Sequence, residues 1–129
     1  RFVREARAQA RVEHDHVVPI YDAAEAGGVA FIAMPLLKGT SLADALKANP
    51  RPPLAAAVRI AREVAEGLAA AHATGLAHRD VKPGNIWLEA GRLRVRLLDF
   101  GLARSGSLDT DPDTATATGE GELVGTPAY

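Results

Sequence analysis

One segment, Leu54 to Thr74, constrains the fold more than any other part of the sequence. Pro53 suits a first helical turn, and Gly75 suits the turn that ends a helix. Its apolar residues recur every three or four positions, which places them on one face of a helix. These residues are Leu54, Ala57, Val58, Ala61, Val64, Ala65 and Leu68. A helix of about 21 residues is ~31 Å long, so the chain must fold around it.

Shorter elements are expected on both sides of this helix. We predict a helix over Arg1–Val12, strands over Val17–Asp22 and Val29–Leu36, a short helix over Ser41–Asn49, and strands over Ile86–Leu88 and Leu93–Leu98. Gly27-Gly28 and Gly91 supply the turns between the paired strands. Asp44, three residues after Ser41, indicates a capping box. Residues 105–122 are almost all polar or small and are predicted to form a mobile loop.

Composition excludes several classes of function. Fifteen basic and sixteen acidic residues give a net charge of −1, which removes any general electrostatic argument for nucleic-acid or anionic-membrane binding. The chain has no cysteine, so disulfides, thiolate metal sites and a cysteine nucleophile are excluded. No apolar run approaches the roughly 18 residues of a membrane span. We therefore expect a cytoplasmic segment that makes no membrane contact itself, which leaves open a membrane anchor outside these residues.

Residues that can carry chemistry gather in the loop His78–Asn85, with the sequence HRDVKPGN. Asp80, Lys82 and Asn85 place a carboxylate, an ammonium and an amide in one tight loop. Asp99-Phe100-Gly101 follows directly after a predicted strand. Each piece alone has a plain structural explanation, but their order and their separation by one hairpin do not.

The order H-R-D-x-K-x-x-N, hairpin, D-F-G and G-T-P-x-Y resembles the catalytic core of eukaryotic-like, bacterial-type serine/threonine protein kinases. The resemblance runs through all 129 residues. It implies an α+β fold that is part of the two-lobed kinase fold. Residues 1–34 would be the end of the N-lobe, 35–39 the hinge, and 40–129 the start of the helical C-lobe through the activation segment.

The resemblance also implies ATP and Mg²⁺ as cofactors and protein Ser/Thr hydroxyls as phosphoryl acceptors. Asp80 would orient the substrate hydroxyl, and Lys82 would neutralise charge on the moving phosphoryl group. Asn85 and Asp99 would supply oxygen ligands of the kind that Mg²⁺ prefers. Glu5 would pair with the lysine that holds the α- and β-phosphates in this family.

Adenine contacts follow from the same resemblance. Met34 matches the gatekeeper, and Pro35 to Leu37 match the hinge whose backbone reads the adenine edge. Leu42 would lie beside the base. Trp87 occupies the place of an aliphatic residue beneath the adenine, and it either stacks on the base, which we favour, or turns into the core.

Other positions match an apolar stack that links the two lobes in this family. His78, Phe100 and Ile20 would be members of it. Gln9 stands where an apolar side chain is expected, and a buried amide without partners is costly. His14, His16 and His72 lack the spacing of metal ligands with a carboxylate partner and are expected to be structural.

Arg79, beside the catalytic aspartate, implies regulation by phosphorylation in the following loop. The candidate acceptors are Thr114, Thr116 and Thr118. Thr126 would instead hydrogen-bond the catalytic aspartate and lysine.

The 129 residues contain no G-x-G-x-x-G loop and no lysine before Glu5. We therefore expect a middle piece of a kinase domain that is inactive alone, with the long helix presenting its apolar stripe to a helix outside these residues. A pseudokinase-like module that binds nucleotide or partners is the alternative, although the intact Asp80, Lys82, Asn85 and Asp99 argue against decay. A plain alanine-rich α+β domain would leave both motifs unexplained.

Overall fold

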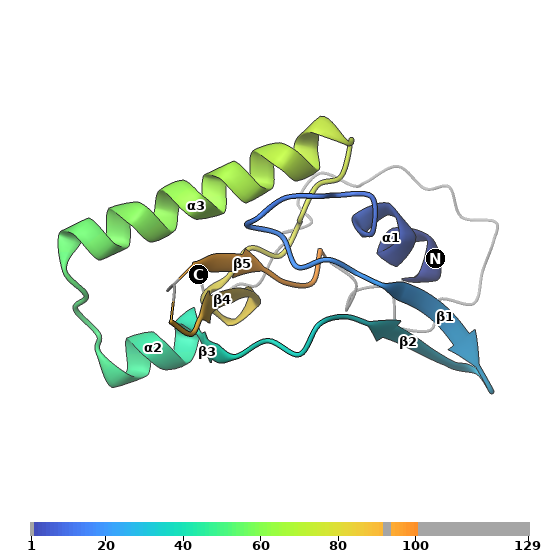
Figure 1. The fold of residues 1–129 in the computed structure, drawn as a ribbon, viewed down its shortest axis with the longest axis horizontal. Coiled ribbons are helices and arrows are strands. Elements are labelled where there is room, and N and C mark those ends of the chain that lie inside the picture. Colours follow the sequence, from blue (N-terminus) through green and yellow to red (C-terminus); the bar gives the residue numbers. More distant parts are fainter. Residues whose placement is uncertain (1, 92–93, 101–129) are drawn as a thin grey trace, which may run out of the picture.

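The computed structural model describes residues 2–91 and 94–100. Its elements are α1 (Phe2–Gln9), β1 (Asp22–Ala26), β2 (Val29–Ala33), β3 (Gly39–Ser41), α2 (Leu42–Ala48), α3 (Leu54–Ala73), the 3₁₀ turn η1 (Pro83–Asn85), β4 (Ile86–Glu89) and β5 (Val95–Leu97) (Figure 1). β1 and β2 form one antiparallel pair, and β3, β4 and β5 form a second antiparallel sheet in that order. The predicted α+β class is confirmed.

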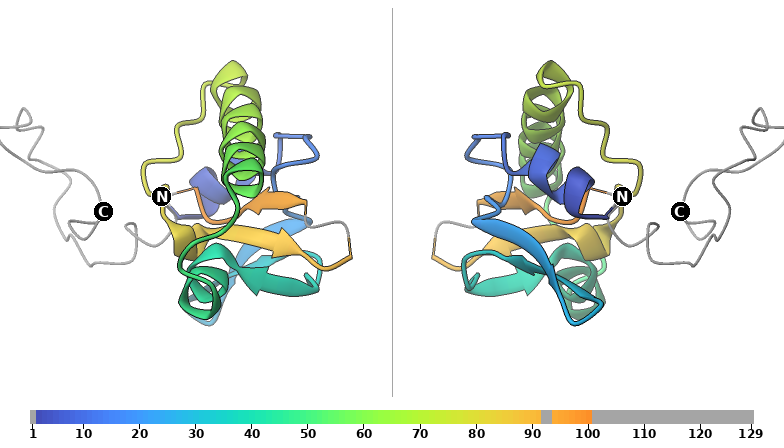
Figure 2. Two further views of the ribbon diagram at one scale, coloured as in Figure 1. Left: turned by 90° about the vertical axis from the view of Figure 1, so that its left-hand side faces the viewer. Right: turned by 90° about the vertical axis from the view of Figure 1, so that its right-hand side faces the viewer.

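The long helix and the second sheet enclose the main core. α3 runs along this sheet, and β5 is the strand nearest to it in both views of Figure 2. The buried members of this core are Val12, Val17, Ala71, Ile86, Val95, Leu97 and Phe100. Ile60, Val64 and Leu68 pack against them from α3. A core built this way fixes the β4–β5 hairpin, and with it the loops at its ends.

Only part of the predicted apolar stripe of α3 faces this core. Val64 and Leu68 pack on it, whereas Leu54 is 80% exposed and Val58 59% exposed. The face against β5 also carries Glu63 and Gly67, which are buried. Val64 and Leu68 therefore pack within the described fold and not, as expected, on a helix outside it, whereas Leu54 and Val58 are exposed.

The first predicted strand is misplaced. The strand is Asp22–Ala26, not Val17–Asp22, and it pairs with β2 from Ala26↔Val29 to Asp22↔Ala33. Gly27 and Gly28 both have positive φ, 59° and 78°, as a two-residue hairpin turn requires. Strands joined by a two-residue turn begin directly beside it. Pairing with β2 therefore makes Asp22–Ala26 a strand, although the residues of this segment have only a weak strand preference.

The segment 16–18 takes a different place, beside β5. The Val18 N–H donates to the Leu97 carbonyl (3.0 Å), and the Leu97 N–H donates to the His16 carbonyl (2.9 Å). Val17 is the centre of this parallel bridge and is buried. The apolar run that looked like a hairpin strand thus covers part of the free edge of β5.

Two further predictions are confirmed in detail. The Ser41 hydroxyl accepts a hydrogen bond from the Asp44 N–H (3.1 Å) and caps α2. α3 ends with Gly75 at φ 78°, where the Leu76 N–H donates to the Ala71 carbonyl. None of the described helices combines the length and apolar character that crossing a membrane needs.

The helix α1 packs on the β1–β2 pair, away from the main core (Figure 1). Ala6, Ile20 and Ala23 form a second buried cluster there, with Ile32 packed against it. Ile20, expected in a stack with Phe100, therefore belongs to a different cluster from Phe100.

Candidate active site

The loop that follows α3 begins with a buried histidine. His78 is 2% exposed, and its ring lies 4.5 Å from the Phe100 ring, centroid to centroid. The predicted contact between these two residues is confirmed. Their stacking holds the start of the catalytic-type loop against the end of β5.

The surroundings of His78 favour its neutral form. Burial lowers the pKa of its imidazole, and this outweighs the opposing effects of the backbone groups of His78 and Leu98 and of the nearby Asp80 and Asp99 carboxylates. Its Nδ1 atom accepts a hydrogen bond from the Asp80 N–H at 3.4 Å. Within the described residues, its buried Nε2 atom has no hydrogen-bond partner. The ring therefore acts as a packing group that also fixes the backbone of the next loop residues.

Three predicted residues meet at one carboxylate oxygen. Lys82 Nζ lies 2.7 Å from Asp80 Oδ2, and the Asn85 side-chain amide donates to the same oxygen at 3.0 Å. The Asn85 amide also donates to the Asp80 carbonyl at 2.9 Å. Asp80 is therefore held by its backbone and its side chain at once, as a group that must orient a substrate requires.

A one-turn 3₁₀ helix brings Asn85 to this position. In η1 the Asn85 N–H donates to the Lys82 carbonyl at 2.9 Å, and Pro83 occupies the first helical position, where no donor is needed. The Asn85 carbonyl then accepts the N–H of Leu98 at 2.9 Å. This bond places Asp99, the next residue, beside Asn85.

Asp99 is exposed and adopts a left-handed backbone, with φ 45°. Such a conformation is strained for a residue other than glycine and often marks a functional position. Because the Asn85 NH₂ group faces Asp80, the amide oxygen of Asn85 and the carboxylate of Asp99 remain as hard oxygen donors. This donor set suits Mg²⁺, which usually takes one or two carboxylates plus phosphates and water. Among the described residues, no three His, Cys, Asp or Glu side chains form a self-sufficient metal site.

The expected adenine-contact residues lie along the connection between β2 and α2. Met34 is 43% exposed, and Pro35, Leu37 and Leu42 are half-buried. Leu42 also packs against the main core. Trp87 is half-buried on β4, opposite Ser41. The indole Nε1–H donates to the Lys38 carbonyl at 3.3 Å, which fixes the ring beside this connection.

Several predicted residues lie outside the described part of the chain. These are Thr114, Thr116, Thr118 and Thr126, together with the side chain of Glu5 in α1. Arg79 is described: it is exposed and has a left-handed backbone, with φ 65°. The structure thus brings together Asp80, Lys82 and Asn85, and it leaves the regulatory residues untested.

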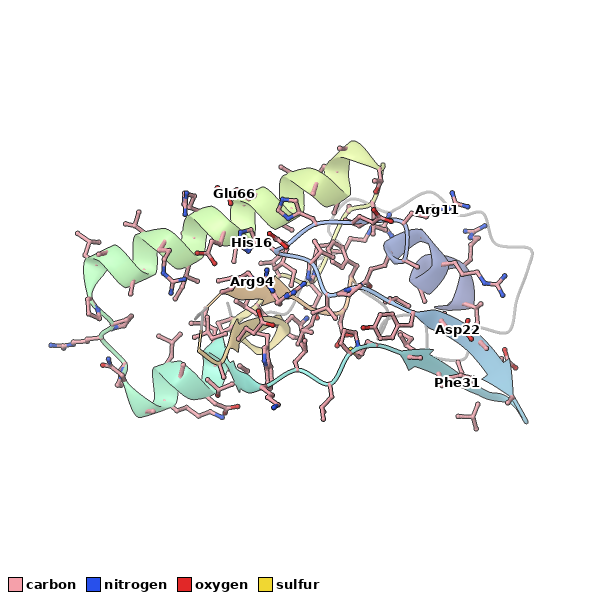
Figure 3. The ribbon with its side chains drawn as sticks, viewed as in Figure 1. Arg11, His16, Asp22, Phe31, Glu66 and Arg94 are labelled. Atoms are coloured by element: carbon pink, nitrogen blue, oxygen red, sulfur yellow. The ribbon has the colours of Figure 1, made fainter. Side chains whose placement is uncertain are left out.

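Two polar residues have partners that the sequence does not indicate. Gln9 is buried, and its Oε1 atom accepts the N–H of Phe100 at 3.4 Å. The Nε2 atom of His16 lies 3.3 Å from Glu66 Oε2 (Figure 3). Both contacts join distant parts of the sequence, which no local spacing indicates.

The fold and this loop together define a class of protein, the catalytic domains of kinase type. The model of the protein kinase domain matches residues 1–129. The chain is 43% identical over 132 residues to the serine/threonine-protein kinase pkn2 of Myxococcus xanthus, covering all of this chain and 15% of that protein. It is 45% identical over 120 residues to PknD of Mycobacterium tuberculosis, covering 92% and 18%.

Solved structures agree with these relatives. The PknI kinase domain of Mycobacterium tuberculosis has a TM-score of 0.69 and 35% identity, over 78% of this chain and 42% of that one. Rad53 in complex with AMP-PNP has a TM-score of 0.73 and 26% identity, over 78% and 28%. The chain belongs to the protein kinase family and, by its relatives, to the serine/threonine kinases. It spans 15% and 18% of the length of the two bacterial kinases pkn2 and PknD.

Proposed function

We propose that this chain is the part of an ATP-dependent serine/threonine kinase that orients the acceptor hydroxyl and binds the metal. The observation that carries the proposal is the convergence of Lys82 and Asn85 on Asp80 Oδ2. An aspartate held in this way can orient the hydroxyl of a serine or threonine and accept its proton, and Lys82 can offset negative charge on the transferred phosphoryl group.

The same proposal assigns the lobes and the cofactors. Residues 1–34 would close the N-lobe, 35–39 form the hinge, and 40–129 begin the C-lobe. Asn85 and Asp99 would hold Mg²⁺, which neutralises phosphate charge when bound. Met34, Pro35, Leu37, Leu42 and Trp87 would surround the adenine of ATP, and Glu5 would fix the phosphate-binding lysine. The near-neutral chain would act in the cytoplasm on protein substrates.

The test separates the roles of two aspartates in the full-length protein. Asp80→Asn should lower phosphoryl transfer by about 10²–10⁴-fold and leave ATP affinity nearly unchanged, because the carboxylate acts on the hydroxyl. Asp99→Ala should instead weaken Mg²⁺-dependent ATP binding. Asp15→Asn, a change at a side chain that is 79% exposed, is the matched control.

The measurements are phosphate transfer to a basic protein substrate and calorimetric ATP binding with and without Mg²⁺. Equal loss of ATP affinity in both variants would contradict the assigned roles. ATP binding without any transfer by the wild type would favour a pseudokinase instead. Residues 1–129 alone lack the glycine-rich loop and a lysine before Glu5, and we propose that they are inactive by themselves.

A further inference from the structure

Gln9, the last residue of α1, is a polar side chain buried at the boundary between the helix and the end of β5. It is 2% exposed, and its Oε1 atom accepts the backbone N–H of Phe100, 91 positions later in the sequence. A buried amide is costly unless it is hydrogen-bonded, so this bond accounts for a glutamine at an otherwise apolar place.

The bond acts directly on the backbone of Asp99. The N–H that Gln9 binds belongs to the peptide group between Asp99 and Phe100, so the bond restrains the ψ angle of Asp99. On the other side, the Leu98 N–H is bound by the Asn85 carbonyl at 2.9 Å. Asp99 lies between these two anchors with its strained φ of 45°. A strained residue persists only where its surroundings determine its conformation.

Gln9 and Asp99 also share a small cavity. Its volume is about 10 Å³, and Val18, Ile32, Met34 and Leu98 are among the other residues that line it. A space of this size accommodates at most about one water molecule. If α1 moved and Oε1 left the Phe100 N–H, a cavity of this size would offer little room for a water molecule to take its place as acceptor.

We propose that Gln9 is a positioning residue that holds Asp99 in its metal-binding orientation through the Phe100 N–H. This inference rests on the proposed function of Asp99. It couples the position of α1 to metal binding by a polar bond, in addition to any apolar packing between them. If Gln9 only filled space, an apolar side chain of equal length would support stability and the Mg²⁺ dependence of ATP binding equally well or better.

The experiment compares Gln9→Met with Gln9→Glu in the full-length protein, with Arg7→Met on the exposed face of α1 as control. Methionine keeps the length and removes the acceptor, whereas glutamate keeps an acceptor oxygen. In Gln9→Met the Phe100 amide should exchange with solvent roughly tenfold faster, and half-saturation of ATP binding should need about three to ten times more Mg²⁺. The melting temperature should fall, because the buried Phe100 N–H is left without an acceptor.

In Gln9→Glu the slow exchange of the Phe100 amide should be retained, although burial of the carboxylate lowers the melting temperature. Arg7→Met should change neither the exchange nor the Mg²⁺ requirement. Unchanged exchange and Mg²⁺ requirement in Gln9→Met would overturn the proposal.

Amide exchange in the wild type tests the bond even if the variants fail to fold. A Phe100 amide that exchanges like a solvent-exposed one would overturn the proposal. A different result would contradict the proposed function: ATP binding by the wild type that does not depend on Mg²⁺.

Discussion

The backbone N–H of Val95 donates to the side chain of Glu63, whose Oε2 atom lies 2.8 Å away in the interior between α3 and β5. The Val95 carbonyl accepts a hydrogen bond from His16 Nδ1 at 2.9 Å. Two side chains thus bind the edge of β5 at Val95, which no further strand covers within residues 2–91 and 94–100. Burial raises the pKa of the Glu63 carboxyl, but the Val95 N–H and the Arg59 guanidinium outweigh burial, and the net pKa lies below its ordinary value.

Replacing Glu63 should destabilise the domain although the partners of its side-chain hydrogen bonds, Val95 and Arg59, are not among the proposed active-site residues. Glu63→Leu leaves the Val95 N–H buried without an acceptor, which should cost about 1–3 kcal/mol of unfolding free energy. Glu63→Gln keeps an acceptor oxygen and should lose less. Urea unfolding at neutral pH measures both, with Glu66→Gln, at a side chain that is 44% exposed, as the control. Equal stability of Glu63→Leu and wild type would show that the bond contributes nothing.

The stability of the domain should depend on pH through His78. Its pKa is lowered in the folded protein from an ordinary value of 6.5, so below that pH the unfolded chain binds protons more readily. The contribution of a neutral His78 is complete above pH 6.5 and is lost as the pH falls from 6.5 toward the folded pKa. His78→Phe retains the ring stacking on Phe100 and should flatten this part of the profile. Thermal melts of both proteins across this range provide the measurement, and identical profiles would exclude His78 as the cause.

Gly67 should not tolerate even a methyl group. A Cβ atom there would lie 2.9 Å from the His16 carbonyl oxygen and 2.9 Å from Leu97 Cδ1. Gly67→Ala should therefore lower stability by about 1–3 kcal/mol through overpacking, despite the helix preference of alanine. Gly84→Ala is the matched control, since no atom lies within 4 Å of its added Cβ. A stabilised Gly67→Ala variant would mean that α3 can shift away from His16 at no cost.

Trp87 should report nucleotide binding. If its ring stacks on adenine, Mg²⁺-ATP will quench indole fluorescence, and Trp87→Leu will abolish that part of the signal. Leucine also provides an apolar surface beneath the base, so phosphoryl transfer should persist, with ATP affinity lower by about 1 kcal/mol from lost aromatic stacking. Fluorescence titration with ATP, paired with a transfer assay, tests this. A quench of equal size in both proteins would place the ring away from the base.

Phosphorylation of the segment after Asp99 should raise activity through Arg79. A phosphate adds about −1.5 to −2 charges that a guanidinium can bind in a bidentate manner. Mass spectrometry of active protein should find phosphate on Thr114, Thr116 or Thr118, and Arg79→Gln should remove the activation. Full activity in a variant with all three threonines changed to alanine would contradict this mechanism.

Local chemistry made much of the structure predictable. The Ser41 cap, the glycine turns and the spacing of Asp80, Lys82 and Asn85 act over a few residues, and each is observed. β1 was misplaced because Val17 and Val18 have the stronger strand preference, whereas the Gly27-Gly28 turn decides the pairing. The Gly27-Gly28 turn is visible in the sequence, and it determines where β1 lies more strongly than the strand preference of the residues does.

Contacts between distant residues could not be read from the sequence. Glu63 meets Val95 across 32 positions, and Gln9 meets Phe100 across 91. Each of these polar side chains lies on a helix where solvent exposure is the ordinary expectation. Only the folded backbone brings a buried N–H within reach and makes the burial favourable.

The Lys38 carbonyl accepts two hydrogen bonds, from Trp87 Nε1 at 3.3 Å and from the Ala90 N–H at 2.8 Å. The chain is therefore fastened to the β4–β5 hairpin from Lys38 onward. Any rocking of α1 and the β1–β2 pair relative to the long helix must be absorbed by Met34–Leu37 and by the residues on either side of segment 16–18, which is bonded to β5. One of the two pivots would then lie directly at the proposed adenine contacts, so that a bound base would restrict the motion at that pivot.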